Sequence, residues 1–129
     1  MATKKRKPVL SRAQKKENSL MAEALAMYAA HEADLYRNQA RYIARALARR
    51  KVKGEYKKEL AIKAFKSLAD NAAKKYNRRF SGRFGSGFGE WKPDIRREAA
   101  KILLGYYEEL IRDYTQDLRA GIPYSKLLD

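Results

Sequence analysis

Cysteine is absent from this chain, and histidine occurs once, at position 31. Without cysteine there is no disulfide framework, thiolate metal site or cysteine nucleophile, and a single histidine excludes a His-rich metal site. No apolar run approaches the roughly 18 residues of a membrane span, and no apolar segment of a secretory signal follows the basic N-terminus. We therefore expect that the protein has no membrane partner. We also expect it to be located in a reducing compartment that contains nucleic acid, the cytoplasm.

Acidic residues are few compared with basic ones: 15 Asp and Glu against 30 Lys and Arg, a formal net charge of +15. Residues 1–92 contain 24 basic and 8 acidic residues, whereas residues 93–129 contain 6 and 7. The excess therefore belongs to the first part of the chain, and this asymmetry indicates a polyanionic partner. The length of 129 residues fits one domain, and a hydrophobic fraction of 45% is enough to form a core.

Apolar residues recur at helical spacing along the chain, and no segment alternates with the period of two that is typical of a strand. The first helical pattern begins after Ser11, a predicted N-cap with Gln14 at capping-box spacing, and runs to Lys53. An unbroken helix of this length would measure about 60 Å, so a bend is predicted near residues 33–38. The predicted inward stripe of the first part, in which His31 is interpreted as a packed side chain, is Leu20, Ala24, Met27, Tyr28, His31 and Leu35.

Glycine and proline predict the ends of the other helices. Gly54 ends the first pattern, and a second helix is expected from Glu55 to about Phe80. Pro93 suits the first turn of a third helix, which Gly121 ends. Because the third helix is apolar over more than half of its circumference, we expect it to lie at the centre.

These patterns predict an all-α fold, a compact bundle of three to four helices. Residues 1–10 are a basic arm, and residues 11–121 are the helical domain, which includes a loop rich in Gly, Arg and Phe at 81–90. Residues 122–129 are a C-terminal tail.

Arginine recurs at every fourth position, at Arg37, Arg41, Arg45 and Arg49, which places these side chains in one slanted row about 18 Å long. The first three lie opposite the apolar residues of the same segment. Further basic residues continue the row: Arg50, Lys51, Lys53, Lys57 and Lys58. This density of positive charge suits a phosphate backbone, and the alternative is a solvated helix face. The second helix differs, because opposite charges are interleaved on its outer face, which we interpret as ordinary surface: Glu59, Lys63, Lys66, Asp70 and Lys74.

Two further segments have the composition of a nucleic-acid contact. Lys4, Lys5, Arg6 and Lys7 form a basic arm that either follows a nucleic-acid backbone or is a disordered solubilising tail. Residues 78–91 interleave arginine, aromatic residues and glycine, so that Arg79 and Arg83 supply phosphate contacts and the aromatic rings stack on bases. The alternative is a connection whose aromatic side chains pack into the core: Phe80, Phe84, Phe88 and Trp91.

No pattern predicts an enzyme. Glu109, Asp113 and Asp117 are spaced by one helical turn each, but a row of carboxylates on one helix is typical of a solvated or ion-paired edge. There is no nucleophile–base pair, phosphate loop or dinucleotide fingerprint. We expect no catalytic residue, no metal and no cofactor.

A resemblance to known proteins is carried by four stretches in the middle of the chain, at residues 35–39, 53–56, 61–65 and 72–76. The segment from about residue 34 to 80 resembles small basic helical proteins of unassigned function that are encoded by tailed bacteriophages. The resemblance implies a phage accessory or virion-associated protein, located in the host cytoplasm or the virion, and it implies no activity or functional residue.

Together these observations predict a non-enzymatic protein that binds DNA or RNA largely without sequence preference. The candidate contact residues are Lys4, Lys5, Arg6, Lys7, Arg37, Arg41, Arg45, Arg49, Arg50, Lys51, Lys53, Arg79 and Arg83. The alternative is a protein-interaction module that binds an acidic surface of a host protein through the same basic face.

Overall fold

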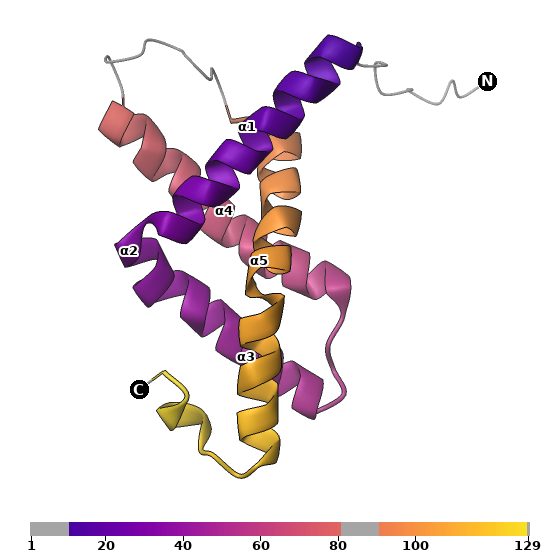
Figure 1. The fold of residues 1–129 in the computed structure, drawn as a ribbon, viewed down its shortest axis with the longest axis vertical. Helices are drawn as coiled ribbons and strands as arrows, with labels where there is room; N and C mark the ends of the chain where they lie inside the picture. Colours follow the sequence, from indigo (N-terminus) through magenta and orange to yellow (C-terminus); the bar gives the residue numbers. More distant parts are fainter. Residues whose placement is uncertain (1–10, 81–90, 129) are drawn as a thin grey trace, which may run out of the picture.

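A computed structural model describes residues 11–80 and 91–128 of the chain, and of Arg79 and Phe80 it describes the backbone alone. Within these ranges the chain is helical and contains no strand, so the predicted all-α class is confirmed (Figure 1). The basic arm and the glycine-rich loop at 81–90 lie outside the described residues. The elements are α1 (Arg12–His31), α2 (Ala33–Leu35), the π-helix η1 (Tyr36–Ala40), α3 (Arg41–Val52), α4 (Lys58–Phe80), α5 (Pro93–Arg119) and the 3₁₀-helix η2 (Tyr124–Lys126).

The capping box predicted at the start of α1 is confirmed. The Gln14 backbone N–H donates to the Ser11 hydroxyl at 3.1 Å, and the Ser11 backbone N–H donates to the Gln14 side chain at 3.1 Å. These two bonds satisfy two backbone donors that the first turn of a helix leaves without partners.

The predicted bend lies at Glu32, one residue before the predicted window. Glu32 has an extended backbone (φ −75°, ψ 114°), which separates α1 from the nearly continuous helix formed by α2, η1 and α3. The π-helical turn of η1 follows directly, and such turns interrupt the regular hydrogen-bond pattern of a helix.

The predicted inward face of α1 is wrong. Leu20 and Met27 are 54% and 53% exposed, and the buried face is mostly alanine: Met21, Ala22, Leu25, Ala26 and Ala29. This face is rotated by about 150° from the predicted one, at 100° per residue. Small side chains allow α1 to approach its neighbours closely, so the core takes the alanine face rather than the bulkier one. His31 is consequently exposed, and its Nδ1 lies 2.8 Å from the Met27 carbonyl oxygen.

Both glycines that predict helix ends adopt the left-handed conformation, with φ of +71° at Gly54 and +94° at Gly121. After α3, the Gly54 N–H bonds to the Lys51 carbonyl at 3.2 Å and the Glu55 N–H bonds to the Arg50 carbonyl at 2.8 Å. This pair of bonds is a Schellman motif, and the same motif follows α5 at Gly121.

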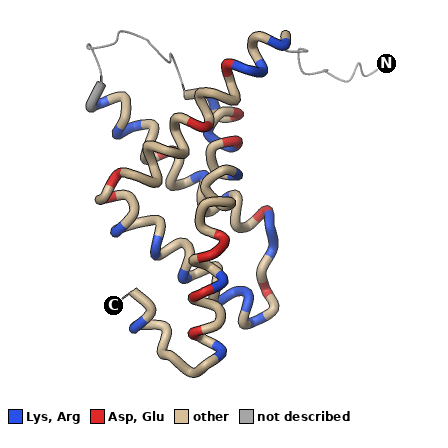
Figure 2. Tube along the Cα trace, in the orientation of Figure 1, with Lys and Arg blue, Asp and Glu red and all other residues tan. Residues whose placement is uncertain are grey.

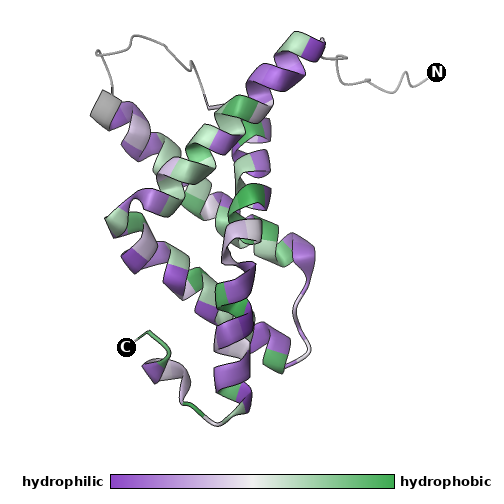
Figure 3. Ribbon diagram, viewed as in Figure 1, coloured by the Kyte–Doolittle hydropathy of each residue, from purple (hydrophilic) through white to green (hydrophobic). Residues whose placement is uncertain are grey.

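The predicted central position of α5 is confirmed, because this helix contacts α1, α3 and α4. Figure 3 shows hydrophobic residues concentrated where α1 crosses α4 and α5, whereas the C-terminal half of α5 is mainly hydrophilic on its visible side. The Phe65 ring on α4 stacks on Tyr107 of α5 with centroids 5.5 Å apart. Trp91 is buried and donates from its indole N–H to Asn77 at 2.9 Å, so this aromatic of the predicted 78–91 segment packs into the core. None of the described helices is long and apolar enough to cross a membrane.

Candidate nucleic-acid interface

Basic residues recur along η1, α3 and α4, while acidic residues gather on α5 (Figure 2). The predicted arginine row begins at Arg37 in η1 and continues along α3. The environment of the row changes along its length, because the last residues of the described chain fold back against α3 (Figure 1).

Arg41 and Arg45 are half-buried beneath this C-terminal segment, residues 122–128. Nη1 of Arg41 donates to the Leu128 carbonyl at 3.1 Å, and Nη1 of Arg45 donates to the Tyr124 carbonyl at 3.2 Å. Leu127, which is 7% exposed, anchors the segment in the core. The sequence predicts that these arginines lie opposite the packed face of the helix. This prediction is wrong, because the C-terminal segment packs over them.

Aromatic rings also hold the row in place. The guanidinium carbon of Arg45 lies 4.1 Å from the centroid of the Tyr124 ring and 5.1 Å from that of Tyr42, and that of Arg49 lies 5.0 Å from Tyr124. Such cation–π contacts stabilise each guanidinium by about 0.5–2 kcal/mol. The Nε atoms of Arg41 and Arg45 are buried and have no hydrogen-bond partner within the described chain. The Nη hydrogen bonds to the C-terminal segment and the contact of Arg45 with Tyr124 nevertheless engage both guanidinium groups inside the protein.

The end of the row is open to solvent. Arg49, Arg50 and Lys53 are exposed and line a hollow of about 360 Å³, together with Ala46, Glu55 and Tyr124. We call this feature the basic hollow. Glu55 is its only acidic lining residue, and no ion pair joins Glu55 to a cation in the part of the chain that the structure describes. The hollow therefore brings together three predicted contact residues whose charge is not neutralised locally.

The other predicted contact residues lie apart from the hollow. Arg37 is exposed near the opposite end of the row, and its carbonyl accepts from Nη2 of Arg41 at 3.3 Å. Lys51 is half-buried, and its ammonium lies 4.8 Å from the centroid of the Tyr56 ring. Five residues lie outside the described chain, as does the side chain of Arg79: Lys4, Lys5, Arg6, Lys7 and Arg83.

The interpretation of α4 as a helix with a mixed, self-compensating surface is revised. Glu59 pairs with Arg97 at 2.7 Å and Asp70 pairs with Arg96 at 2.8 Å, so both carboxylates face α5. The hydrogen bond from Arg97 and its positive charge lower the pKa of Glu59. The basic residues of α4 that have no ion pair in the described ranges are Lys58, Lys63, Lys66, Lys74 and Arg78. The exposed surface of α4 is more cationic than its sequence indicates.

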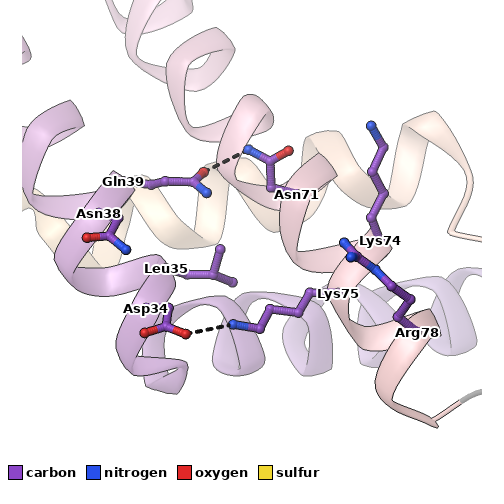
Figure 4. A pocket seen from close by; sticks show the side chains of 8 residues that line it. All are labelled: Asp34, Leu35, Asn38, Gln39, Asn71, Lys74, Lys75 and Arg78. Carbon is purple, nitrogen blue, oxygen red and sulfur yellow. Dashed lines mark hydrogen bonds and ion pairs between the residues drawn. The ribbon is translucent and has the colours of Figure 1, made fainter.

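Sequence reasoning missed a second hollow, a groove between α4 and the α2–η1 segment. It has a volume of about 730 Å³ and is drawn in Figure 4. Its lining residues are Asp34, Leu35, Asn38, Gln39, Asn71, Lys74, Lys75 and Arg78. The polar residues at 38, 39 and 71 have no spacing that predicts a site, and they meet across the packing of η1, which follows the break at Glu32 and α2, against α4.

The row of three carboxylates on α5 lies along the surface of the molecule. Glu109 and Asp113 are exposed, Asp117 is half-buried, and the described residues contain no group of His, Asp or Glu that could hold a metal ion.

Comparisons with known protein families, curated proteins and solved structures found no match to this chain.

Proposed function

We propose that this chain is a non-enzymatic protein that binds nucleic acid through its phosphate backbone, with little dependence on sequence, and that it acts as a phage accessory or virion-associated factor. The phage assignment rests on the resemblance of residues 34–80. The observation that carries the binding function is the basic hollow, where Arg49, Arg50 and Lys53 are exposed without ion-pair partners in the described chain.

Exposed arginine and lysine side chains suit this task for a physical reason. Each cation that contacts a phosphate releases condensed counterions, so the logarithm of the binding constant falls by about 0.9 per contact and per decade of salt on duplex DNA. The three cations lie at the C-terminal end of α3, where the negative end of the helix dipole stabilises positively charged side chains. On α4, the exposed cations Lys74 and Arg78 extend the positive surface beyond the hollow.

A salt series tests the proposal. Binding of fluorescein-labelled duplex DNA, single-stranded DNA and RNA is measured by anisotropy for the wild type and for Arg49→Ala/Arg50→Ala/Lys53→Ala. We expect the variant to bind duplex DNA more weakly, with a salt slope shallower by about 0.9 for each phosphate that the variant no longer reaches.

A matched control removes the same charge elsewhere. Lys92→Ala/Arg112→Ala/Arg119→Ala also loses three exposed cations, two of them on the acidic helix α5. We expect its salt slope to stay close to that of the wild type. Equal slopes for the two variants would show that net charge, and not the basic hollow, determines binding. No binding by the wild type at low salt would contradict the function, and a nuclease-treated pull-down from host lysate would then test an acidic protein surface as the partner.

A further inference from the structure

The groove between α4 and η1 differs from the basic hollow in that amide side chains line it. Asn38 and Gln39 line the groove from η1, and Asn71, Lys74 and Arg78 line it from α4. Gln39 and Asn71 point towards each other and Arg78 points towards η1, whereas the Lys74 side chain is directed away from η1 (Figure 4). Its volume of about 730 Å³ falls in the range of small-ligand sites. Buried Leu35 supplies an apolar patch on its wall.

The amide groups are held in place by each other. Nδ2 of Asn71 donates to Oε1 of Gln39 at 2.8 Å, which joins the two walls of the groove. Within the described chain this bond leaves the Asn71 carbonyl oxygen as an acceptor and the Gln39 amide nitrogen as a donor. Asn38 is exposed and adds a third amide. Paired donors and acceptors of this kind match the edges of nucleobases, as in the bidentate contacts of Asn and Gln with adenine.

The basic residues that line the groove from α4 differ in whether they form ion pairs. Lys75 donates to Glu32 at 3.0 Å and to Asp34 at 3.3 Å, and these bonds raise the pKa of its ammonium group. Lys75 therefore pairs with both carboxylates beside the groove and offsets one of their two negative charges. Lys74 and Arg78 are exposed and have no ion pair in the described ranges, so both are available to an anion.

The spacing of these residues fits a ligand with two different ends. Asn71, Lys74 and Arg78 follow at intervals of three and four residues on one side of α4, so the amide and the outermost cation are about 10 Å apart along the helix axis. One end of the groove thus offers the amide groups of Gln39 and Asn71. The other end offers two cations, together with Leu35 and the Asp34 carboxylate that pairs with Lys75 (Figure 4).

From this arrangement we propose that the groove binds one unpaired nucleotide of a single strand. The amides of Asn38, Gln39 and Asn71 contact the base edge, and Lys74 and Arg78 contact the adjoining phosphate. A base inside a duplex is stacked and paired and does not enter such a groove without being extruded. The protein therefore prefers single strands to duplexes. This inference rests on the proposed function and specifies the form of nucleic acid that it concerns.

The experiment compares a labelled oligodeoxyadenylate with the duplex that it forms with oligodeoxythymidylate, at one salt concentration. We expect the wild type to bind the single strand more tightly than the duplex. Asn38→Ala should weaken single-strand binding at least about fivefold, which corresponds to about 1 kcal/mol. It should change duplex binding less than about twofold and leave the salt slope unaltered, because asparagine carries no charge and the phosphate partners remain in place. Asn38 is exposed, so the fold should be retained, and the far-ultraviolet circular dichroism checks this.

The phosphate end is tested with Lys74→Ala/Arg78→Ala. Its single-strand salt slope should be shallower by about 0.7 for each phosphate that these side chains no longer reach. The control Lys63→Ala/Lys66→Ala, on the same helix outside the groove, should change the slope less. An oligomer of abasic sugar-phosphate serves as a second probe, and we expect it to bind more weakly than the oligodeoxyadenylate.

The outcomes separate this inference from the proposed function. Equal affinity of the wild type for single strand and duplex would overturn the groove proposal and leave the backbone-binding function standing. Equal binding of the abasic oligomer, or an Asn38→Ala variant with the wild-type preference, would overturn the groove proposal in the same way. If the wild type binds neither form at low salt, both fail.

Discussion

Arg41 and Arg45, in the first half of α3, lie under the C-terminal segment, whereas Arg49 and Arg50 further along the same helix are exposed. The first pair donates to backbone carbonyl oxygens of Leu128 and Tyr124. Of the second pair, Arg49 meets one face of the Tyr124 ring, and both line the basic hollow. A periodic row of like charges is therefore not one functional surface, because the segment that packs over the row determines which charges a ligand reaches.

The largest expected effect separates the two pairs by stability. Arg41→Ala/Arg45→Ala removes three charge-assisted hydrogen bonds, two of them to the C-terminal segment, and we expect it to lower the free energy of unfolding by about 3 kcal/mol. Arg49→Ala/Arg50→Ala should lower that free energy by about 1 kcal/mol or less in total, mainly through the lost contact of Arg49 with Tyr124. Urea unfolding followed by circular dichroism measures both values. Equal losses in the two variants would remove the distinction.

A second variant tests whether the C-terminal segment, residues 122–128, restricts access to Arg41 and Arg45. Leu127→Ala should lower the free energy of unfolding by about 2 kcal/mol, because a buried leucine side chain is truncated. Release of the segment should also free Arg41 and Arg45, so the salt slope on duplex DNA should become steeper by about 0.9 for each additional phosphate that they reach. Ile122→Ala, at a position 40% exposed in the same segment, is the control and should change neither quantity appreciably. If Leu127→Ala lowers stability but leaves the slope unchanged, the segment does not restrict binding.

The end of α3 that carries Arg49 and Arg50 depends on the backbone conformation of Gly54 rather than on packing of the C-terminal segment. Gly54 has a φ of +71°, and no atom lies within 4 Å of the place that a Cβ would occupy, so Gly54→Ala meets a conformational cost without a steric clash. We expect a loss of about 1 kcal/mol in the free energy of unfolding. Gly105→Ala, inside α5 with equally open space, should instead stabilise the protein by up to about 1 kcal/mol. Thermal melts of the two variants should shift in opposite directions, and a shift in the same direction would contradict the assigned backbone conformation.

The smallest effect uses Tyr114 as a reporter of the covered pair. Burial raises the pKa of Tyr114 and so does Tyr36, while the positive charges of Arg41 and Arg45 act in the opposite direction. Arg41→Ala/Arg45→Ala should therefore raise this pKa further, and Arg49→Ala/Arg50→Ala should leave it unchanged. A nuclear magnetic resonance titration of the tyrosine Cζ carbons measures the difference, and equal shifts in both variants would contradict it.

The raised pKa of Tyr114 also makes stability depend on pH. Because the folded-state pKa is raised, the contribution of Tyr114 is fully present below the pKa of the unfolded tyrosine, 10.0, and is lost as the pH rises through the folded value. Tyr107 behaves alike, since burial, followed by the effect of Tyr36, raises its pKa to about 12. Alkaline conditions should therefore destabilise the fold.

Local signals predicted the ends of the helices well. Ser11, Gly54, Pro93 and Gly121 all mark boundaries in the structure, because capping depends on residues within one turn of the helix end. The central place of α5 was also predictable, since its apolar surface is too wide to face a single neighbour.

Long-range contacts explain what the sequence did not predict. Arg41 meets Leu128 across 87 positions and Arg45 meets Tyr124 across 79, and neither pairing leaves a periodic trace. The inward face of α1 was misplaced because Leu20 and Met27 are more hydrophobic than the alanines that pack more closely. The acidic residues of α4 look self-compensating in sequence, but the packing of two helices turns Glu59 and Asp70 towards the arginines of α5.

Which arginines bind nucleic acid can be seen directly by nuclear magnetic resonance of the arginine Nε–Hε groups during titration with a short oligonucleotide at low salt. We predict saturable shifts for Arg49 and Arg50 at the basic hollow, and much smaller ones for Arg41, Arg45 and the α5 residue Arg112. Shifts that are largest at Arg41 and Arg45, shifts spread evenly over all five groups, or no shift at all would show that the basic hollow is not the binding surface.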